Sequence, residues 1–116
     1  MDVVAAVIVG LVAVLHVYIL VLEMFLWTAP AGRRAFGLAP DFAEATKVLG
    51  ANQGLYNGFL AAGLFWGLVS GRDDVRLFFL GCVAVAGVFG AVTSSPRILL
   101  VQTVPAGLGI VAVLLS

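Results

Sequence analysis

Two ionisable side chains in the first apolar segment have chemical types that bind protons, ligands or metal ions. His16 and Glu23 both lie in the segment at residues 3–27. Their spacing of seven residues is about two turns of an α-helix, so both side chains would lie on nearly the same helix face. A carboxylate surrounded by hydrocarbon costs at least about 2.5 kcal/mol, so Glu23 must pair, take up a proton or face water. We therefore take Glu23 and His16 as candidate catalytic or ligand-binding groups.

A second polar group stands in the next apolar segment, in the run Asn-Gln-Gly-Leu-Tyr-Asn-Gly at residues 52–58. Amide and phenol groups donate the hydrogen bonds that an ionised carboxylate accepts. In antiparallel helices the start of this run lies about as deep as Glu23, and its end lies nearer His16. We expect these side chains to converge, together with Trp27 and Gln102, in one intramembrane polar pocket. Its candidate ligand-binding residues are Asn52, Gln53, Tyr56, Asn57, Trp27 and Gln102.

The same residues admit a simpler interpretation, in which they only hold helices together. Intramembrane His, Asn and Gln side chains often hydrogen-bond between helices, at about 0.6 kcal/mol each. We favour the pocket because packing alone rarely needs a carboxylate such as Glu23. His16 and Glu23 alone are too few ligands for a strong transition-metal site, although a symmetric homo-oligomer would double them. A bound metal and a cofactor are therefore left open, and Cys82 is expected to be a small buried side chain.

The lengths of the apolar segments predict the elements that position these groups. The chain has 116 residues, of which 63% are hydrophobic and 10% charged, and its mean hydropathy is +1.19. A soluble domain carries about 25% charged residues, so the solvent of most of this surface must be lipid. Each of the four apolar segments approaches the roughly 20 residues that a transmembrane helix needs. The sequence therefore predicts one all-α domain, residues 1–116, which is an integral membrane four-helix transmembrane bundle with spans at roughly 3–27, 48–70, 75–93 and 98–115.

Turn and breaker residues separate the predicted spans. Residues 28–47 contain prolines and glycines typical of a loop. Asp41 with Glu44 resembles a capping box that begins a helix near Phe42. Pro105, inside the last segment, is expected to kink the helix or free a carbonyl. Small residues at four-residue spacing in the second span predict close helix packing. They form two series, Gly50, Gly54, Gly58 and Ala62, followed by Gly63, Gly67 and Gly71.

The charged residues indicate the partners and the topology. Six Lys and Arg residues balance six Asp and Glu residues without a basic cluster, which argues against nucleic acid as a partner. The first and third loops hold more Lys and Arg than the second, so positive-inside counting places them in the cytoplasm. Both termini of this multi-pass protein are then expected outside the cell (inner) membrane, with the lipid bilayer as the main partner.

The polar residues also carry a resemblance to a known family. His16, Glu23 and Trp27, followed by the run at residues 52–58, resemble the pattern of a family of small bacterial and fungal integral membrane proteins called a domain of unknown function. The resemblance covers essentially the whole chain. It implies four spans and a shared polar set, and it implies no particular activity.

Three functions are compatible with this pattern. The first, which we favour, is a pocket that binds a small ligand or ion, with catalysis by Glu23 or His16 left open. The second is a small proton-coupled exporter that uses Glu23. This reading is an architectural analogy, and the position of Glu23 near a helix end counts against it. The third is a structural or interaction subunit of a membrane complex, in which the glycine series would make intermolecular contacts.

Overall fold

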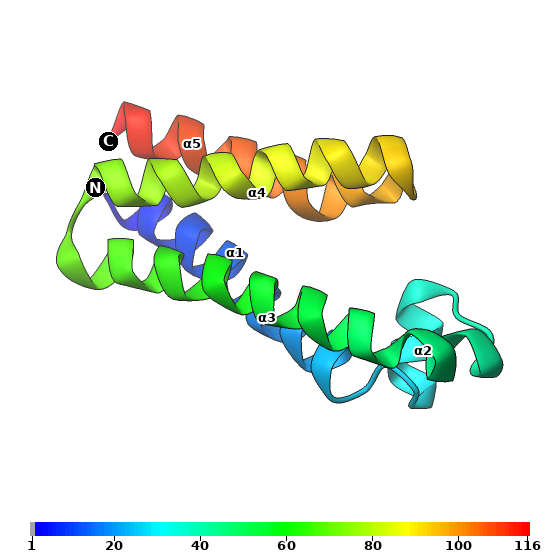
Figure 1. Cartoon of the computed structure of the whole chain (residues 1–116). Helices are drawn as coiled ribbons and strands as arrows, with labels where there is room; N and C mark the ends of the chain where they lie inside the picture. The colour runs from blue at the N-terminus through cyan, green and yellow to red at the C-terminus, as the bar shows by residue number, and fades with distance from the viewer. Residues whose placement is uncertain (1) are drawn as a thin grey trace. The chain divides into compact units, whose positions relative to one another are not determined.

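The protein is all-α over residues 2–116, which are the residues that the computed structural model describes (Figure 1). The helices are α1 (Val3–Met24), α2 (Pro30–Phe36), α3 (Pro40–Ser70), α4 (Asp73–Thr93), the π-helix η1 (Leu99–Thr103) and α5 (Val104–Leu115). The described residues contain no strand. The predicted all-α class is therefore confirmed.

Two of these helices are long and apolar enough to cross a membrane. α1 has 22 residues and α4 has 21, and the mean hydropathies of their most apolar stretches are 2.8 and 2.2. The apolar helical stretch at Leu99–Leu115 is shorter. α3 has 31 residues, but the amides of Asn52, Gln53 and Asn57 lower the hydropathy of its apolar part. Length and composition thus give two candidates within residues 2–116, where the sequence pattern predicts four spans.

The segment predicted as the first loop is partly helical. α1 ends at Met24, so Trp27, which the sequence pattern places in the first span, lies in the turn that follows. α2 then occupies seven residues of this segment. Pro30 begins α2, where a missing N–H costs nothing because the first amides of a helix have no helical partner. Gly37 ends α2 in the left-handed conformation, with φ of 66°, which glycine adopts without a steric penalty.

The start of α3 also differs from the prediction. The helix begins at Pro40, because the amide of Ala43 already bonds the carbonyl of Ala39 at 2.9 Å. Asp41 therefore lies inside the first turn and not at the cap position before it. The predicted capping box near Phe42 is wrong, and a proline at the first helical position begins the helix instead.

A π-helix stands where Pro105 is expected to distort the last segment. The amide of Val104 donates to the carbonyl of Leu99, five residues earlier, which widens the turn. Proline has no N–H to give to the carbonyl four residues before it. The regular α-helical pattern resumes in α5, after this widened turn.

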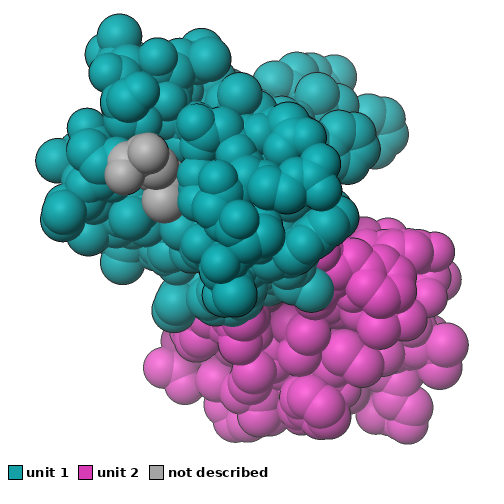
Figure 2. All heavy atoms as spheres, turned by 90° about the vertical axis from the view of Figure 1, so that its left-hand side faces the viewer, with its two compact units in different colours: residues 1–14, 60–116 teal, residues 15–59 magenta. Residues whose placement is uncertain are grey.

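The described chain forms two compact units (Figure 2). Unit 1 comprises residues 1–14 and 60–116, and unit 2 comprises residues 15–59. Unit 1 has a core of small and branched side chains from α1, α3, α4 and α5. These side chains are Ala5, Val9, Val12, Ala13, Leu64, Leu80, Val83, Ala106 and Val113.

Glycine lets α4 approach the last segment closely within unit 1. A Cβ atom at Gly87 would collide with the hydroxyl of Thr103 and lie 2.8 Å from its backbone nitrogen. The Thr103 hydroxyl donates to the carbonyl of Ala84 at 3.1 Å, which fixes the contact. Gly81, on the same helix, has nothing within 4 Å of such a Cβ atom.

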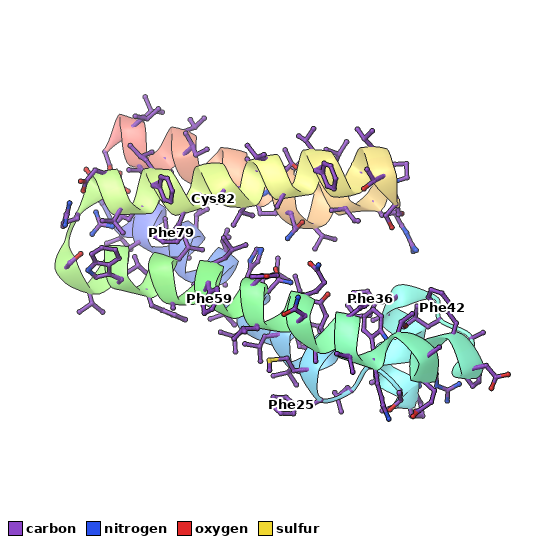
Figure 3. The ribbon with its side chains drawn as sticks, viewed as in Figure 1. Phe25, Phe36, Phe42, Phe59, Phe79 and Cys82 are labelled. Carbon is purple, nitrogen blue, oxygen red and sulfur yellow. The ribbon has the colours of Figure 1, made fainter. Side chains whose placement is uncertain are left out.

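The second glycine series of α3 is partly a packing surface. A Cβ atom at Gly63 would overlap the ring of Phe79, whose side chain extends from α4 (Figure 3). Gly67 contacts the backbone and side chain of Arg76. Close packing is therefore confirmed at Gly63 and Gly67. Gly71, in contrast, lies in the turn after α3 with φ of 71°, so its role is conformational.

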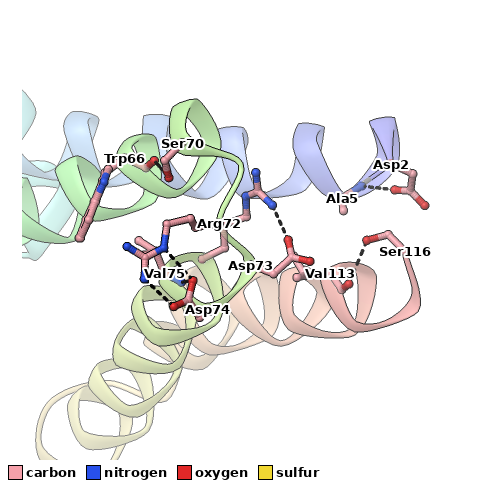
Figure 4. A network of polar contacts seen from close by, with 11 residues as sticks. Asp2, Ala5, Trp66, Ser70, Arg72, Asp73, Asp74, Val75, Val113 and Ser116 are labelled. Carbon is pink, nitrogen blue, oxygen red and sulfur yellow. Dashed lines mark hydrogen bonds and ion pairs between the residues drawn. The ribbon is translucent and has the colours of Figure 1, made fainter.

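Two ion pairs stabilise the turn between α3 and α4 (Figure 4). Arg72 Nη2 bonds Asp74 Oδ2 at 2.7 Å in an exposed pair, and water and salt screen such pairs strongly. Arg76 pairs with Asp73, although the Arg76 side chain is only 4% exposed. Within residues 2–116 the Arg76 Nε atom has no hydrogen-bond partner. Gly67 leaves the space that this buried guanidinium side chain needs.

We predict opposite effects on stability for the same substitution at two glycines of α4. Gly87→Ala should lower the free energy of unfolding by about 1–3 kcal/mol, because the new methyl group forces the helices apart. Gly81→Ala should raise it by about 0.5–1 kcal/mol, because alanine favours the helix and meets open space. Thermal unfolding in detergent measures both. Equal effects at the two sites would contradict the close contact at Gly87.

Candidate functional site

Unit 2 contains almost all of the residues that the sequence predicts for the site. These are His16, Glu23, Trp27, Asn52, Gln53, Tyr56 and Asn57. They come from the second half of α1, the turn after it and the first half of α3. Gln102 belongs to unit 1, in η1, so its membership of the site stays a prediction.

The centre of the site is a hydrogen bond between α1 and α3. The amide Nδ2 of Asn57 donates to Glu23 Oε1 at 2.5 Å. The same Nδ2 atom also donates to the carbonyl of Gln53 at 3.1 Å, one helical turn earlier. Glu23 lies in the last turn of α1 and is only 8% exposed. The carboxyl group is therefore buried and held by a donor from another helix.

The first glycine series of α3 makes this hydrogen bond possible. A Cβ atom at Gly54 would lie 2.5 Å from Met24 Cγ, 3.1 Å from Glu23 Cβ and 3.2 Å from the carbonyl of Leu20. At Gly58 it would lie 2.7 Å from Leu20 Cδ1. The absence of side chains at these positions lets the end of α1 lie directly on α3, so the predicted close packing is confirmed here.

His16 is fully buried, as is expected for a side chain on the same face of α1 as Glu23. The two residues are seven positions apart in one continuous helix, which is about 10 Å along the axis. A single small molecule or a chain of waters would be needed to connect them. The role of His16 as an acid–base group stays a prediction.

The other predicted site residues of α3 are not the donors of the hydrogen bond to Glu23. Asn52, Gln53 and Tyr56 are exposed, and among the described residues Asn57 supplies the hydrogen bond to Glu23. The ring of Tyr56 packs edge-on against Phe59, with centroids 6.2 Å apart. The sequence pattern also allowed these three side chains to donate hydrogen bonds to Glu23. In the described residues the donor to Glu23 is Asn57 instead. Their part in binding a ligand stays a prediction.

Trp27 has a clear packing role in unit 2. The indole Nε1 donates to Thr46 Oγ1 at 3.1 Å, and that hydroxyl donates to the carbonyl of Phe42 at 2.7 Å. The ring lies against Gly50, where a Cβ atom would be 2.5 Å from Cδ2. Its centroid is 5.1 Å from that of Phe36. Trp27 therefore joins the turn after α1 to both α2 and α3.

A groove of about 340 Å³ lies beside Trp27. It is lined by Met24, Phe25, Trp27, Thr28, Lys47, Val48 and Ala51. Glu23 and Asn57 do not line it. The sequence pattern did not indicate this groove or the partner of Trp27, because both depend on how the turn after α1 packs on α3.

The site does not contain an evident metal centre. Among residues 2–116 no group of three or more His, Cys, Asp and Glu side chains is close enough to hold a metal ion. Glu23 and Asn57 offer oxygen atoms, which suit a cation weakly unless other ligands are added.

We predict that Thr46 stabilises unit 2 by accepting the indole N–H. Thr46→Val keeps the shape of the side chain but leaves this donor without a partner, so the free energy of unfolding should fall by about 1–2 kcal/mol. Thr93 is a matched control, because its hydroxyl also donates to the carbonyl four residues earlier, that of Phe89, at 2.7 Å. Thr93→Val should have a smaller effect in the same thermal unfolding measurement. Similar losses at both positions would show that Trp27 does not depend on Thr46.

A family model and a curated relative match most of the chain. Residues 10–114 match the family described as "Protein of unknown function (DUF1304)". The chain is also 33% identical over 111 residues to the "Uncharacterized protein YpaA" of Lactococcus lactis subsp. lactis (strain IL1403), which covers 91% of this chain and 90% of that protein. No solved structure matches the chain. The resemblance seen in the sequence is therefore confirmed, and the protein belongs to the DUF1304 family.

Proposed function

We propose that this protein is a multi-pass integral membrane protein whose unit 2 binds a small cation or a hydrogen-bond-donating ligand at Glu23 and Asn57. The observation that carries the proposal is the buried carboxyl group of Glu23, held by Asn57 at 2.5 Å. An ionisable side chain within an apolar helix is expensive, and such residues usually mark a functional site.

The unused hydrogen-bonding groups indicate the class of ligand. The Nδ2 group of Asn57 already donates to two acceptors, Glu23 and the carbonyl of Gln53. A carboxylate has about four lone-pair sites and an amide oxygen has two, so what remains at this pair is acceptor capacity. A ligand that supplies positive charge or N–H and O–H donors therefore fits better than an anion. The exposed amides of Asn52 and Gln53 are nearby groups that can add selectivity.

Two other functions are less well supported. A proton-coupled exporter needs its essential carboxylate near the middle of the membrane, but Glu23 lies one residue before the end of α1, at Met24. A purely structural role would be served by an uncharged pair such as two amides, at lower cost than a buried carboxyl group.

Membrane insertion is supported by the length and hydropathy of α1 and α4. The four-span arrangement also requires α3 and the last segment to cross. The amides of α3 make its crossing expensive unless they bind a ligand or a partner, so the proposed site and the proposed topology depend on each other.

We predict that Glu23→Gln removes a bound ligand without unfolding the protein. The substitution keeps an oxygen that accepts from Asn57 but removes the negative charge. Native mass spectrometry of gently solubilised protein should show an extra mass on the wild type and none on this variant. It also reports the oligomeric state.

Glu44→Gln is the matched control, because Glu44 is an exposed carboxylate on α3 that pairs with Lys47, three residues later. This variant should keep the extra mass, and both variants should elute from gel filtration like the wild type. Bare protein in all three samples would contradict retained binding. Aggregation of Glu23→Gln alone would favour a structural role.

Labelling of single cysteines from outside the cell tests the four-span topology. After Cys82 is replaced by serine, the protein has no other cysteine. Arg34→Cys should then react with an impermeant thiol reagent only after the cells are opened, whereas Arg72→Cys should react in intact cells. The reason is that α3 carries the chain across the membrane between these positions. If both react from the same side, α3 does not cross.

A further inference from the structure

The groove beside Trp27 is lined mainly by apolar side chains and by one cation, that of Lys47. Met24, Phe25, Val48 and Ala51 supply the wall, and Thr28 and Lys47 supply polar groups. Phe25 and Val48 are 71% and 76% exposed, and Phe25 extends away from the ribbon (Figure 3). The wall therefore presents large apolar side chains to whatever fills the groove.

The charged residue that lines this groove is Lys47. Arg33, which is not a lining residue, donates from Nε to the carbonyl of Thr28, another lining residue, at 3.2 Å. Glu44 takes one of the three N–H donors of Lys47, in a pair whose side chains are 55% and 63% exposed. The other two donors remain available to a ligand, and an exposed pair of this kind exchanges partners readily.

The position of the groove along the chain corresponds to the headgroup level of a bilayer. Met24 ends the apolar helix α1, and the lining residues Phe25, Trp27 and Thr28 follow in the turn. Tryptophan and lysine or arginine side chains are typical of this level, where a membrane span meets water. A molecule with an acyl chain at one end and an anionic group at the other matches both the apolar wall and the lysine of the groove.

We propose that this groove binds one anionic membrane phospholipid, with its phosphate at Lys47 and its acyl chain along Met24, Phe25, Val48 and Ala51. The site is distinct from Glu23 and Asn57, which do not line the groove. The proposal rests on the membrane insertion of α1 but not on ligand binding at Glu23.

Competition between two lipids tests the proposal. Delipidated protein in neutral detergent is offered equal amounts of phosphatidylglycerol and phosphatidylcholine with identical acyl chains, and the bound lipid is identified by native mass spectrometry. The wild type should retain one phosphatidylglycerol with about a fivefold preference, which is the effect expected of one lysine near an anionic headgroup. Lys47→Gln should reduce the preference to near one. Ala51→Leu should reduce the binding of both lipids, because it fills the groove.

Two control variants separate this site from other effects. Arg97→Gln removes an exposed cation of unit 1 and should leave the preference unchanged. Glu23→Gln should also leave it unchanged, so failure of the ligand site and failure of the lipid site are distinguishable. An undiminished preference in Lys47→Gln, or an equal loss in Arg97→Gln, would overturn the proposal. Binding of glycerol phosphate as tight as that of the whole lipid would also overturn it, because the apolar wall would then contribute nothing.

Discussion

The contact between the end of α1 and the middle of α3 depends on one constraint, which is the absence of side chains on α3 at Gly50, Gly54 and Gly58. A methyl group at Gly54 would meet Met24, Glu23 and the backbone of Leu20. Only this close approach brings the Glu23 carboxyl group within reach of the short Asn57 side chain. The hydrogen bond at the site is therefore a consequence of helix packing, and small residues are the usual means of such packing in membranes.

Trp27 extends the same contact beyond the end of the apolar helix. Its ring occupies the space over Gly50, and its indole N–H finds an acceptor in Thr46. A tryptophan in this position buries its apolar ring against the packed helices, while its N–H still reaches a hydrogen-bond acceptor. Trp27 also lines the groove, whose other lining residues come from the end of α1, the turn after it and α3.

The membership of the DUF1304 family gives the polar residues a shared context but no chemistry. The chemistry is inferred from the hydrogen-bond donors and acceptors of each place. The Nδ2 group of Asn57 donates to two acceptors inside the protein. The hydrogen-bonding capacity that remains at Glu23 and Asn57 is therefore that of their oxygen acceptors. The groove differs from this pair, because its charged lining residue is the cation of Lys47. The two proposals therefore concern chemically different places in unit 2, one for a donor or a cation and one for an anion.

The sequence by itself determined the helical class, the group of polar residues from which Glu23 and Asn57 come, and most of the glycine positions at which helices pack closely. These follow from hydrophobic segment length, from the rarity of carboxylates and amides in apolar helices, and from the four-residue spacing of glycines, all of which are local properties. It could not determine which polar side chain meets Glu23. Asn52, Gln53, Tyr56 and Asn57 all lie within about two turns of one helix, and only Asn57 has the direction that the packing of α1 on α3 requires. The sequence also predicted the ends of the first loop wrongly, because Pro30 and Pro40 are a residue type found both in loops and at the first position of a helix. The tertiary structure decided these points, since helix rotation and helix ends depend on what the neighbouring segment packs against.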